Sequence, residues 1–146
     1  MRHILILIFM VLPLSASSQR LNIERVLDGR YKKNPHTTDV VYKGQHLFDL
    51  SIDYFHSLTV EDDEQIMDIM ADAFRQDEKH AAYKEVTKRG QHIYFGLYMM
   101  KYNGEANRFA LFKDLRYAPS GSKKQVILIY MEGYCSIDKI KKMFKK

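Results

Sequence analysis

Six histidines and eighteen acidic residues are the groups of this chain that could bind a metal or transfer protons. His46 and His56 have the same parity in one strand-like run, so we expect them to face the same side. Their separation would be roughly 33 Å in an unbroken strand, whereas each ligand of a zinc ion lies about 2 Å from it. His80 and His92 flank a predicted hairpin, but the sequence has no HxH, HxxxH or HExxH spacing. We therefore expect no metal site.

Acidic residues gather between Glu61 and Asp72, which raises the question of a calcium site. A calcium loop alternates oxygen ligands around a glycine turn. This stretch contains no glycine and continues into a helical pattern. Because acids suit the positive end of a helix, we interpret the cluster as the start and the solvated face of a helix.

Motifs of nucleophilic or nucleotide-dependent catalysis are missing from the sequence. It lacks GxSxG, GxGxxG and GxxxxGK, so we expect no cofactor and favour a non-enzymatic role. Asp49 and Asp53 match the solvated side of a strand rather than a pair of hydrolytic acids. A periplasmic hydrolase using His and Asp or Glu residues is the alternative. It requires a cleft in which a histidine lies within about 3 Å of a carboxylate, and the candidates are His46, His56, His80 and His92.

The strand-like run QHIYFGLYMMK, residues 91–101, carries candidates for ligand binding. Alternation places on one face Ile93, Phe95, Leu97 and Met99. The other face carries His92, Tyr94 and Tyr98, and we predict these three as binding residues. Packing in the core is the alternative interpretation of the two tyrosines.

A short basic helix is predicted at the C-terminal end. Its apolar stripe comprises Ile137, Ile140, Met143 and Phe144. Lys139, Lys142 and Lys145 border the stripe, and we predict them as residues that could bind an anionic membrane surface or an acidic partner. The alternative is that the stripe packs on a sheet while the lysines complement the negative helix end.

Cys135 is the only cysteine, so no internal disulfide can form. It has no histidine beside it in sequence that could activate the thiol. A lone thiol in an exported protein is either buried and inert or pairs between chains. We expect Cys135 to be buried.

The secondary-structure elements that would position these residues follow from the spacing of the apolar side chains, which has either the period of a strand or that of a helix. Residues 46–60 alternate apolar and polar side chains, as a strand with one solvated face does. Residues 62–79 follow a helical period, with a capping pair of Asp62 and Gln65. The apolar stripe of this helix comprises Ile66, Ile69, Met70, Ala73 and Phe74. Four strand-like runs follow, joined by short hairpin-type links.

From these patterns we predict an α+β fold. Short links between consecutive strands favour an antiparallel meander of about five or six strands. We expect the main helix and the short C-terminal helix to pack on one face of this sheet.

The first 18 residues have the features of an export signal. Residues 4–14, ILILIFMVLPL, are apolar but too few for a bilayer-spanning helix, which needs roughly 20 residues. The small residues of SASSQ predict cleavage between Ser18 and Gln19. Residues 19–146 then form one domain without an integral membrane span. Export and a net charge of only +5 argue against nucleic acid as a partner.

The segments SASSQ, VLDGRYKK, SLTVEDDEQIMDIM and VILIYMEGYCSIDKIKKMF resemble small exported proteins of unknown function from Bacteroidetes-type bacteria. The resemblance implies an α+β fold and a location in the periplasm or outer envelope, and it brings no known activity, cofactor or catalytic residue. We therefore expect an exported, non-enzymatic domain that binds a protein or envelope component. The binding surface would be the Tyr94/Tyr98 face or an exposed sheet edge, and the oligomeric state stays open.

Overall fold

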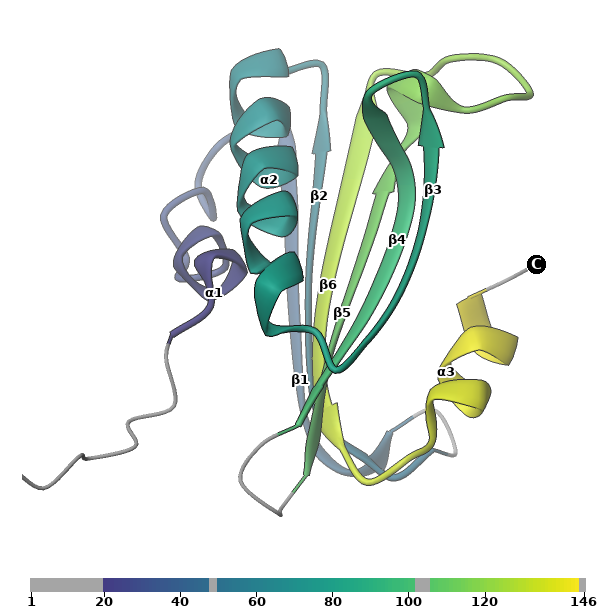
Figure 1. Ribbon diagram of the computed structural model, residues 1–146. Helices are drawn as coiled ribbons and strands as arrows, with labels where there is room; N and C mark the ends of the chain where they lie inside the picture. The colour runs from purple at the N-terminus through teal and green to yellow at the C-terminus, as the bar shows by residue number, and fades with distance from the viewer. Residues whose placement is uncertain (1–19, 48–49, 102–105, 145–146) are drawn as a thin grey trace, which may run out of the picture.

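A computed structural model describes residues 20–47, 50–101 and 106–144 (Figure 1). The helices are α1 (Asn22–Val26), α2 (Glu64–Gln76) and α3 (Ile137–Phe144), with the short 3-10 helices η1 (Asp77–His80) and η2 (Leu115–Tyr117). The strands are β1 (Thr37–Leu47), β2 (Ile52–Glu61), β3 (Tyr83–Arg89), β4 (His92–Lys101), β5 (Asn107–Asp114) and β6 (Gln125–Gly133). The predicted signal segment, residues 1–18, and Lys145 lie outside the described residues.

The strands form one six-stranded antiparallel sheet with the order β1-β2-β6-β5-β4-β3. β1 and β2 form a hairpin, and β3 to β6 form a meander whose last strand pairs with β2. Such pairing follows from the short links, because neighbouring antiparallel strands need only a tight turn between them. The predicted α+β class with an antiparallel meander is confirmed. α2 lies in the connection from β2 to β3 and crosses one face of the sheet (Figure 1).

The start of α2 is capped one residue later than predicted. The carboxylate of Asp63 accepts a hydrogen bond from the backbone N–H of Ile66 at 3.2 Å, which satisfies one of the unpaired donors of the first turn. Asp62, the predicted cap, instead has a φ of 58°. This left-handed residue turns the chain from β2 into the helix, so it cannot itself be the cap.

α2 and α1 cover the first face of the sheet. The side chains that α2 buries there are Ile66, Met67, Met70, Ala73 and Phe74. Ile69, which the sequence assigned to this stripe, is exposed, and Met67 takes its place. At 100° per residue the buried arc is centred near Met70, and Ile69 lies outside it.

An aromatic stack joins α2 to the sheet. The ring of Phe74 lies 4.1 Å from that of Tyr98 and 5.0 Å from that of Phe112, nearly parallel to both. A Cβ atom at Gly96 would lie 2.3 Å from Cε1 of Phe74. Glycine at this position therefore lets the ring pack directly on the backbone of β4.

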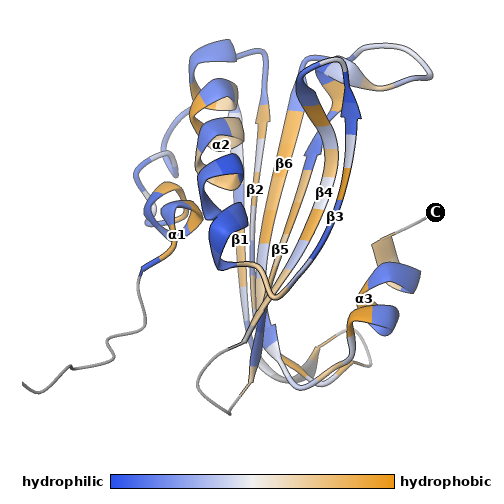
Figure 2. Cartoon of the chain, in the orientation of Figure 1, coloured by the Kyte–Doolittle hydropathy of each residue, from blue (hydrophilic) through white to orange (hydrophobic). Residues whose placement is uncertain are grey.

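α3 packs at one end of the opposite face, where Ile140 is buried with Leu97, Phe109 and Met131 (Figure 1). This differs from the expectation that both helices pack on one face. Hydrophobic residues occupy most of the central strands β4, β5 and β6 (Figure 2). Because successive residues of a strand point to opposite faces of the sheet, these strands are apolar on both faces. Because α1 and α2 already cover one of them, the stripe of α3 is buried against the other.

A β-bulge in β4 changes which of its side chains share a face. Thr87 pairs with Phe95 and Lys88 pairs with Ile93, so Tyr94 is one extra residue between these pairs. An extra residue shifts the alternation by one position. Ile93 therefore packs with the α2 side while Phe95 packs with the α3 side, and the predicted grouping of these two residues is wrong.

Candidate functional site

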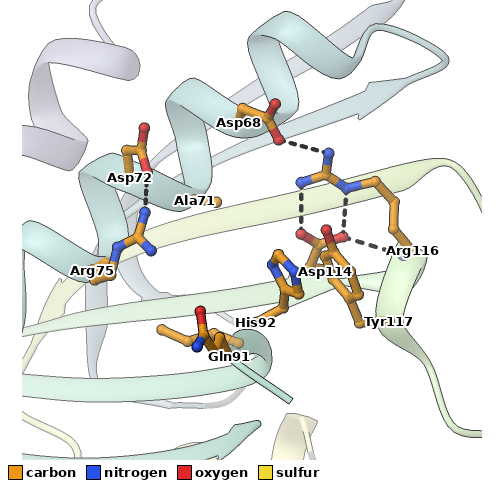
Figure 3. Close-up of a pocket in the computed structure, with 10 residues that line it drawn as sticks. Asp68, Ala71, Asp72, Arg75, Gln91, His92, Asp114, Arg116 and Tyr117 are labelled. Carbon is orange, nitrogen blue, oxygen red and sulfur yellow. Dashed lines mark hydrogen bonds and ion pairs between the residues drawn. The ribbon is translucent and has the colours of Figure 1, made fainter. Parts of the chain in front are cut away.

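A pocket of about 320 Å³ lies between α2 and the ends of β4 and β5 (Figure 3). Three segments that are distant in sequence form its walls. Its lining residues are Asp68, Ala71, Asp72, Arg75, Gln91, His92, Ile93, Asp114, Arg116 and Tyr117. We refer to it as the α2 pocket. Most of these side chains are polar, so the pocket offers hydrogen-bonding groups around a small apolar floor.

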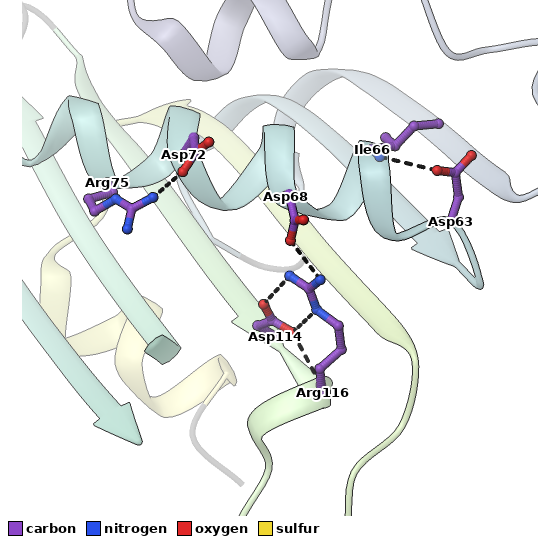
Figure 4. Close-up of polar contacts among 7 residues, drawn as sticks. All are labelled: Asp63, Ile66, Asp68, Asp72, Arg75, Asp114 and Arg116. Carbon is purple, nitrogen blue, oxygen red and sulfur yellow. Dashed lines mark hydrogen bonds and ion pairs between the residues drawn. The ribbon is translucent and has the colours of Figure 1, made fainter. Parts of the chain in front are cut away.

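One wall consists of the solvent-facing side of α2. Asp68, Asp72 and Arg75 recur at helical spacing and lie on one side of the helix (Figure 4). Asp72 and Arg75 form an exposed ion pair. The acidic cluster that the sequence suggests is a solvated helix face thus contributes two carboxylates to the pocket.

Arg116, at η2, connects the opposite wall to α2. Its Nε and Nη2 atoms donate to the two carboxylate oxygens of Asp114 at 2.9 and 2.8 Å, and Nη1 donates to Asp68 at 2.8 Å (Figure 4). The side chains of Arg116 and Asp114 are only 12% and 2% exposed. The hydrogen bond with Asp114 raises the pKa of Arg116 further above its ordinary value. The guanidinium is therefore a fixed cation.

His92 and Tyr117 form an aromatic pair beside Arg116. The rings of His92 and Tyr117 stack at 4.1 Å with an interplanar angle of 4°. The guanidinium carbon of Arg116 lies 5.5 Å from the centre of the Tyr117 ring, within the range of a cation–π contact. Flat polar and aromatic surfaces thus meet at this end of the pocket.

A second pocket of about 510 Å³ adjoins the first, because Asp68, Arg116 and Tyr117 line both. Its other lining residues are Glu64, Ser122, Lys123 and Lys124, and we refer to it as the lysine pocket. The α2 pocket has three carboxylates and two guanidinium groups in its lining. The lysine pocket has two carboxylates and three cationic groups. The charge of the combined surface therefore changes sign along its length.

Of the predicted binding residues on β4, the structure places only His92 in this site. Tyr98 is fully buried, and burial raises the pKa of its hydroxyl. Its place against Phe74 agrees with the core interpretation. Tyr94 is partly buried at the bulge, so the three residues do not form one exposed surface.

Lys139 and Lys142 belong to α3, which lies on the opposite face of the sheet, away from these pockets (Figure 1). Lys139 and Lys142 are exposed. Lys141 instead contacts β3: its Nζ lies 3.0 Å from Glu85 and 4.6 Å from the centre of the Tyr83 ring. Hydrogen bonds to Tyr83 and Glu85 raise the pKa of Lys141 to about 12. Binding by Lys139 and Lys142 stays a prediction.

His56 meets the distance required for hydrolysis. Nε2 of His56 lies 2.7 Å from Oδ1 of Asp39, and the Tyr54 hydroxyl lies 3.4 Å from Nδ1 of the same ring. Both members of the His56–Asp39 pair are 8% exposed, and they line neither the α2 pocket nor the lysine pocket. The pair has the geometry of an acid–base dyad, and the hydrolase role stays a prediction.

Cys135 is buried at the bend between β6 and α3, in contact with the cluster under α3. Burial raises the pKa of its thiol, and the thiolate is the reactive form. We expect iodoacetamide to label the folded protein at pH 8 about tenfold or more slowly than the protein in concentrated urea. Mass spectrometry of timed samples measures both rates. Equal rates, or a disulfide-linked dimer on a non-reducing gel, would contradict the inert interpretation.

Within residues 20–47, 50–101 and 106–144, no group of three or more His, Cys, Asp or Glu residues could hold a metal ion. No helix in those ranges has the length and apolar character needed to cross a membrane.

A family model described as a family of unknown function (DUF6108) matches residues 9–144. No curated protein and no solved structure matches the chain significantly. The family match agrees with the expected protein of unknown function, whereas the bacterial group and export stay predictions.

Proposed function

Because the chain belongs to a family of unknown function, DUF6108, we propose its function from the geometry of the two pockets. It is an exported, non-enzymatic domain that binds a protein or envelope component. The ligand lies along the α2 pocket and the lysine pocket.

The fixed position of Arg116 is the observation that carries this proposal. Asp114 and Asp68 hold the guanidinium from two sides, and Tyr117 packs beside it. Side chains that are ordered before binding lose little conformational entropy when a ligand arrives. A concave site with a few oriented polar groups beside aromatic rings is the usual form of a ligand site.

The charges around the site indicate the chemistry of the ligand. Asp68 and Asp72 present carboxylates on one side, and Lys123 and Lys124 present ammonium groups on the other. A polar ligand with hydrogen-bond donors or a cation at one end and an anionic group at the other would complement both pockets. Catalysis is less well supported, because the arginines hold the carboxylates of the α2 pocket as ion pairs, and no general base lies beside a nucleophile there.

Export is part of the proposal and is supported by sequence features alone. The apolar run of residues 4–14 and the small residues of SASSQ are typical of a cleaved signal. In that location the ligand is a molecule of the cell envelope. Fractionation of cells that express the full chain, followed by N-terminal sequencing, tests export separately from binding.

The binding proposal is tested with the mature protein, residues 19–146, as bait in an envelope extract. The pocket variant is Gln91→Ala with His92→Ala, since both residues are exposed and their loss should leave the fold intact. The matched control is Lys139→Ala with Lys142→Ala on α3. We expect the pocket variant to bind the recovered ligand about tenfold more weakly than the wild type, and the control to bind unchanged.

Two other outcomes favour the alternatives. Salt-sensitive sedimentation with anionic vesicles that only the α3 variant loses would support a basic module for membrane surfaces. Recovery of a cleaved ligand, with cleavage lost on His56→Ala, would support the hydrolase. Equal binding by the wild type and the pocket variant would contradict the proposed site.

A further inference from the structure

The sheet has two edge strands, β1 and β3, because the strand order begins with one and ends with the other. An edge strand leaves one row of its backbone N–H and C=O groups without a neighbouring strand. Proteins commonly protect such edges with charged residues, bulges or short strands. The two edges of this sheet differ in that protection.

β3 is a protected edge. It has seven residues, of which four are charged: Lys84, Glu85, Lys88 and Arg89. The β-bulge opposite Thr87 and Lys88 interrupts its pairing with β4. Lys141 from α3 also packs against its first residues. These features work against the addition of another strand.

β1 lacks most of these features. Thr37 to Lys43 pairs with β2 in continuous register, and the irregularity comes only after Lys43. Asp39 is the one carboxylate in that segment, and its side chain is held at 2.7 Å from His56. No proline or arginine occurs in this strand. Its outer side is therefore a regular row of backbone groups.

Apolar side chains are exposed beside that row. Val41 is 44% exposed and Tyr42 is 51% exposed. They are two of the four large hydrophobic residues that are exposed among the described residues. Because neighbouring residues of a strand point to opposite faces, an added strand would find an apolar contact on both faces of the sheet. Tyr42 also rests against Phe55, with ring centres 5.9 Å apart, so its position is defined.

The charges near β1 decide which occupant fits. Lys32 and Lys33 are exposed just before the strand, and Lys43 is exposed within it. Asp39, the one carboxylate of the segment Thr37 to Lys43, is paired with His56, and the whole chain carries a net charge of +5. A second copy would bring the same positive charge to the edge, whereas an acidic segment would complement it.

We propose that β1 binds an extended, acidic segment of another protein, which pairs with its outer edge as an additional antiparallel or parallel strand. Backbone hydrogen bonds supply the affinity, and alternate apolar side chains contact Val41 and Tyr42. This surface is separate from the α2 and lysine pockets, so experiments can disprove one proposed binding site without disproving the other.

Selection from a random phage-displayed peptide library against residues 19–146 tests this proposal. We expect enriched peptides to alternate apolar and acidic residues. A synthetic copy with alternate backbone amides N-methylated should lose binding, because it can no longer pair as a strand. Val41→Glu with Tyr42→Glu removes both apolar contacts and repels an acidic segment, so it should weaken binding about tenfold or more. Val41→Glu alone, which keeps the Tyr42–Phe55 contact, should weaken it in the same direction.

The matched controls are Thr87→Glu on the β3 edge and the Gln91→Ala, His92→Ala pocket variant, both of which should bind the peptide unchanged. Thermal unfolding of each variant separates loss of binding from loss of fold. The proposal is overturned by an absence of acidic alternating peptides, by binding that survives N-methylation, or by equal losses on the two edges. Self-association through β1 in sedimentation velocity would also overturn it, in favour of a second copy as the occupant.

Discussion

Replacing Arg116 with methionine is expected to lower the free energy of unfolding by about 4 kcal/mol. The substitution leaves the carboxylate of Asp114, which is only 2% exposed, without its bidentate partner. An unpaired buried charge costs far more than the pair itself contributes. The variant also releases the hydrogen bond between η2 and Asp68 on α2. Urea denaturation followed by circular dichroism measures the change.

Two controls separate this effect from the loss of an ordinary ion pair. Arg75→Met removes an exposed pair with Asp72, and we expect a loss of less than about 0.5 kcal/mol. Asp114→Asn in the Arg116→Met background removes the stranded charge and should recover a large part of the stability. A loss in Arg116→Met no larger than in Arg75→Met would show that Arg116 does not hold the wall of the pocket.

Replacing Asp77 with alanine is expected to lower the free energy of unfolding by about 3 kcal/mol. Asp77 is fully buried in η1 and accepts hydrogen bonds from the backbone N–H groups of Asn22 and Ile23, both at 2.9 Å. It also accepts one from the side chain of Asn22 at 2.8 Å. These contacts satisfy the first donors of α1, which would otherwise be left unpaired beside the core. The same urea measurement applies.

The matched control for this variant is Asp72→Ala, which removes an exposed aspartate from the neighbouring helix. We expect it to change the free energy of unfolding by less than about 0.5 kcal/mol. Hydrogen exchange should locate the effect of Asp77→Ala in α1, where the amides of Ile23 to Val26 lose protection first. Uniform loss of protection across the sheet, or an effect as small as that of the control, would contradict this role.

The spacing of apolar residues was sufficient to predict elements that have a single strong pattern. α2 presents one apolar stripe and was predicted near its observed position. The single strand predicted at residues 46–60 instead contains the end of β1, at Leu47, and most of β2, which begins at Ile52. The side of the sheet that α3 covers has no such signal, because β4, β5 and β6 are apolar on both faces. The bulge at Tyr94 is also hidden, since it depends on the pairing with Thr87 and Lys88.

Of the three binding residues predicted on β4, only His92 belongs to the site. It was predicted as one face with Tyr94 and Tyr98, and it lies in the α2 pocket without them. Arg116 was missed because its role depends on Asp68, 48 residues earlier in the chain. The one local signal is the Asp114–Leu115–Arg116 sequence at the end of β5, where an acid and an arginine two residues apart can form a bidentate pair.

Site-specific photo-crosslinking in envelope-containing cells measures directly whether a ligand occupies the pockets. A photoreactive amino acid replaces Gln91 at the rim of the α2 pocket and, in a parallel strain, Lys139 on α3. The binding proposal predicts a defined adduct from position 91 that disappears when His92→Ala is added, and no such adduct from position 139. The same adduct from both positions, or adducts from position 139 alone, would show that the pockets are not where this protein binds its ligand.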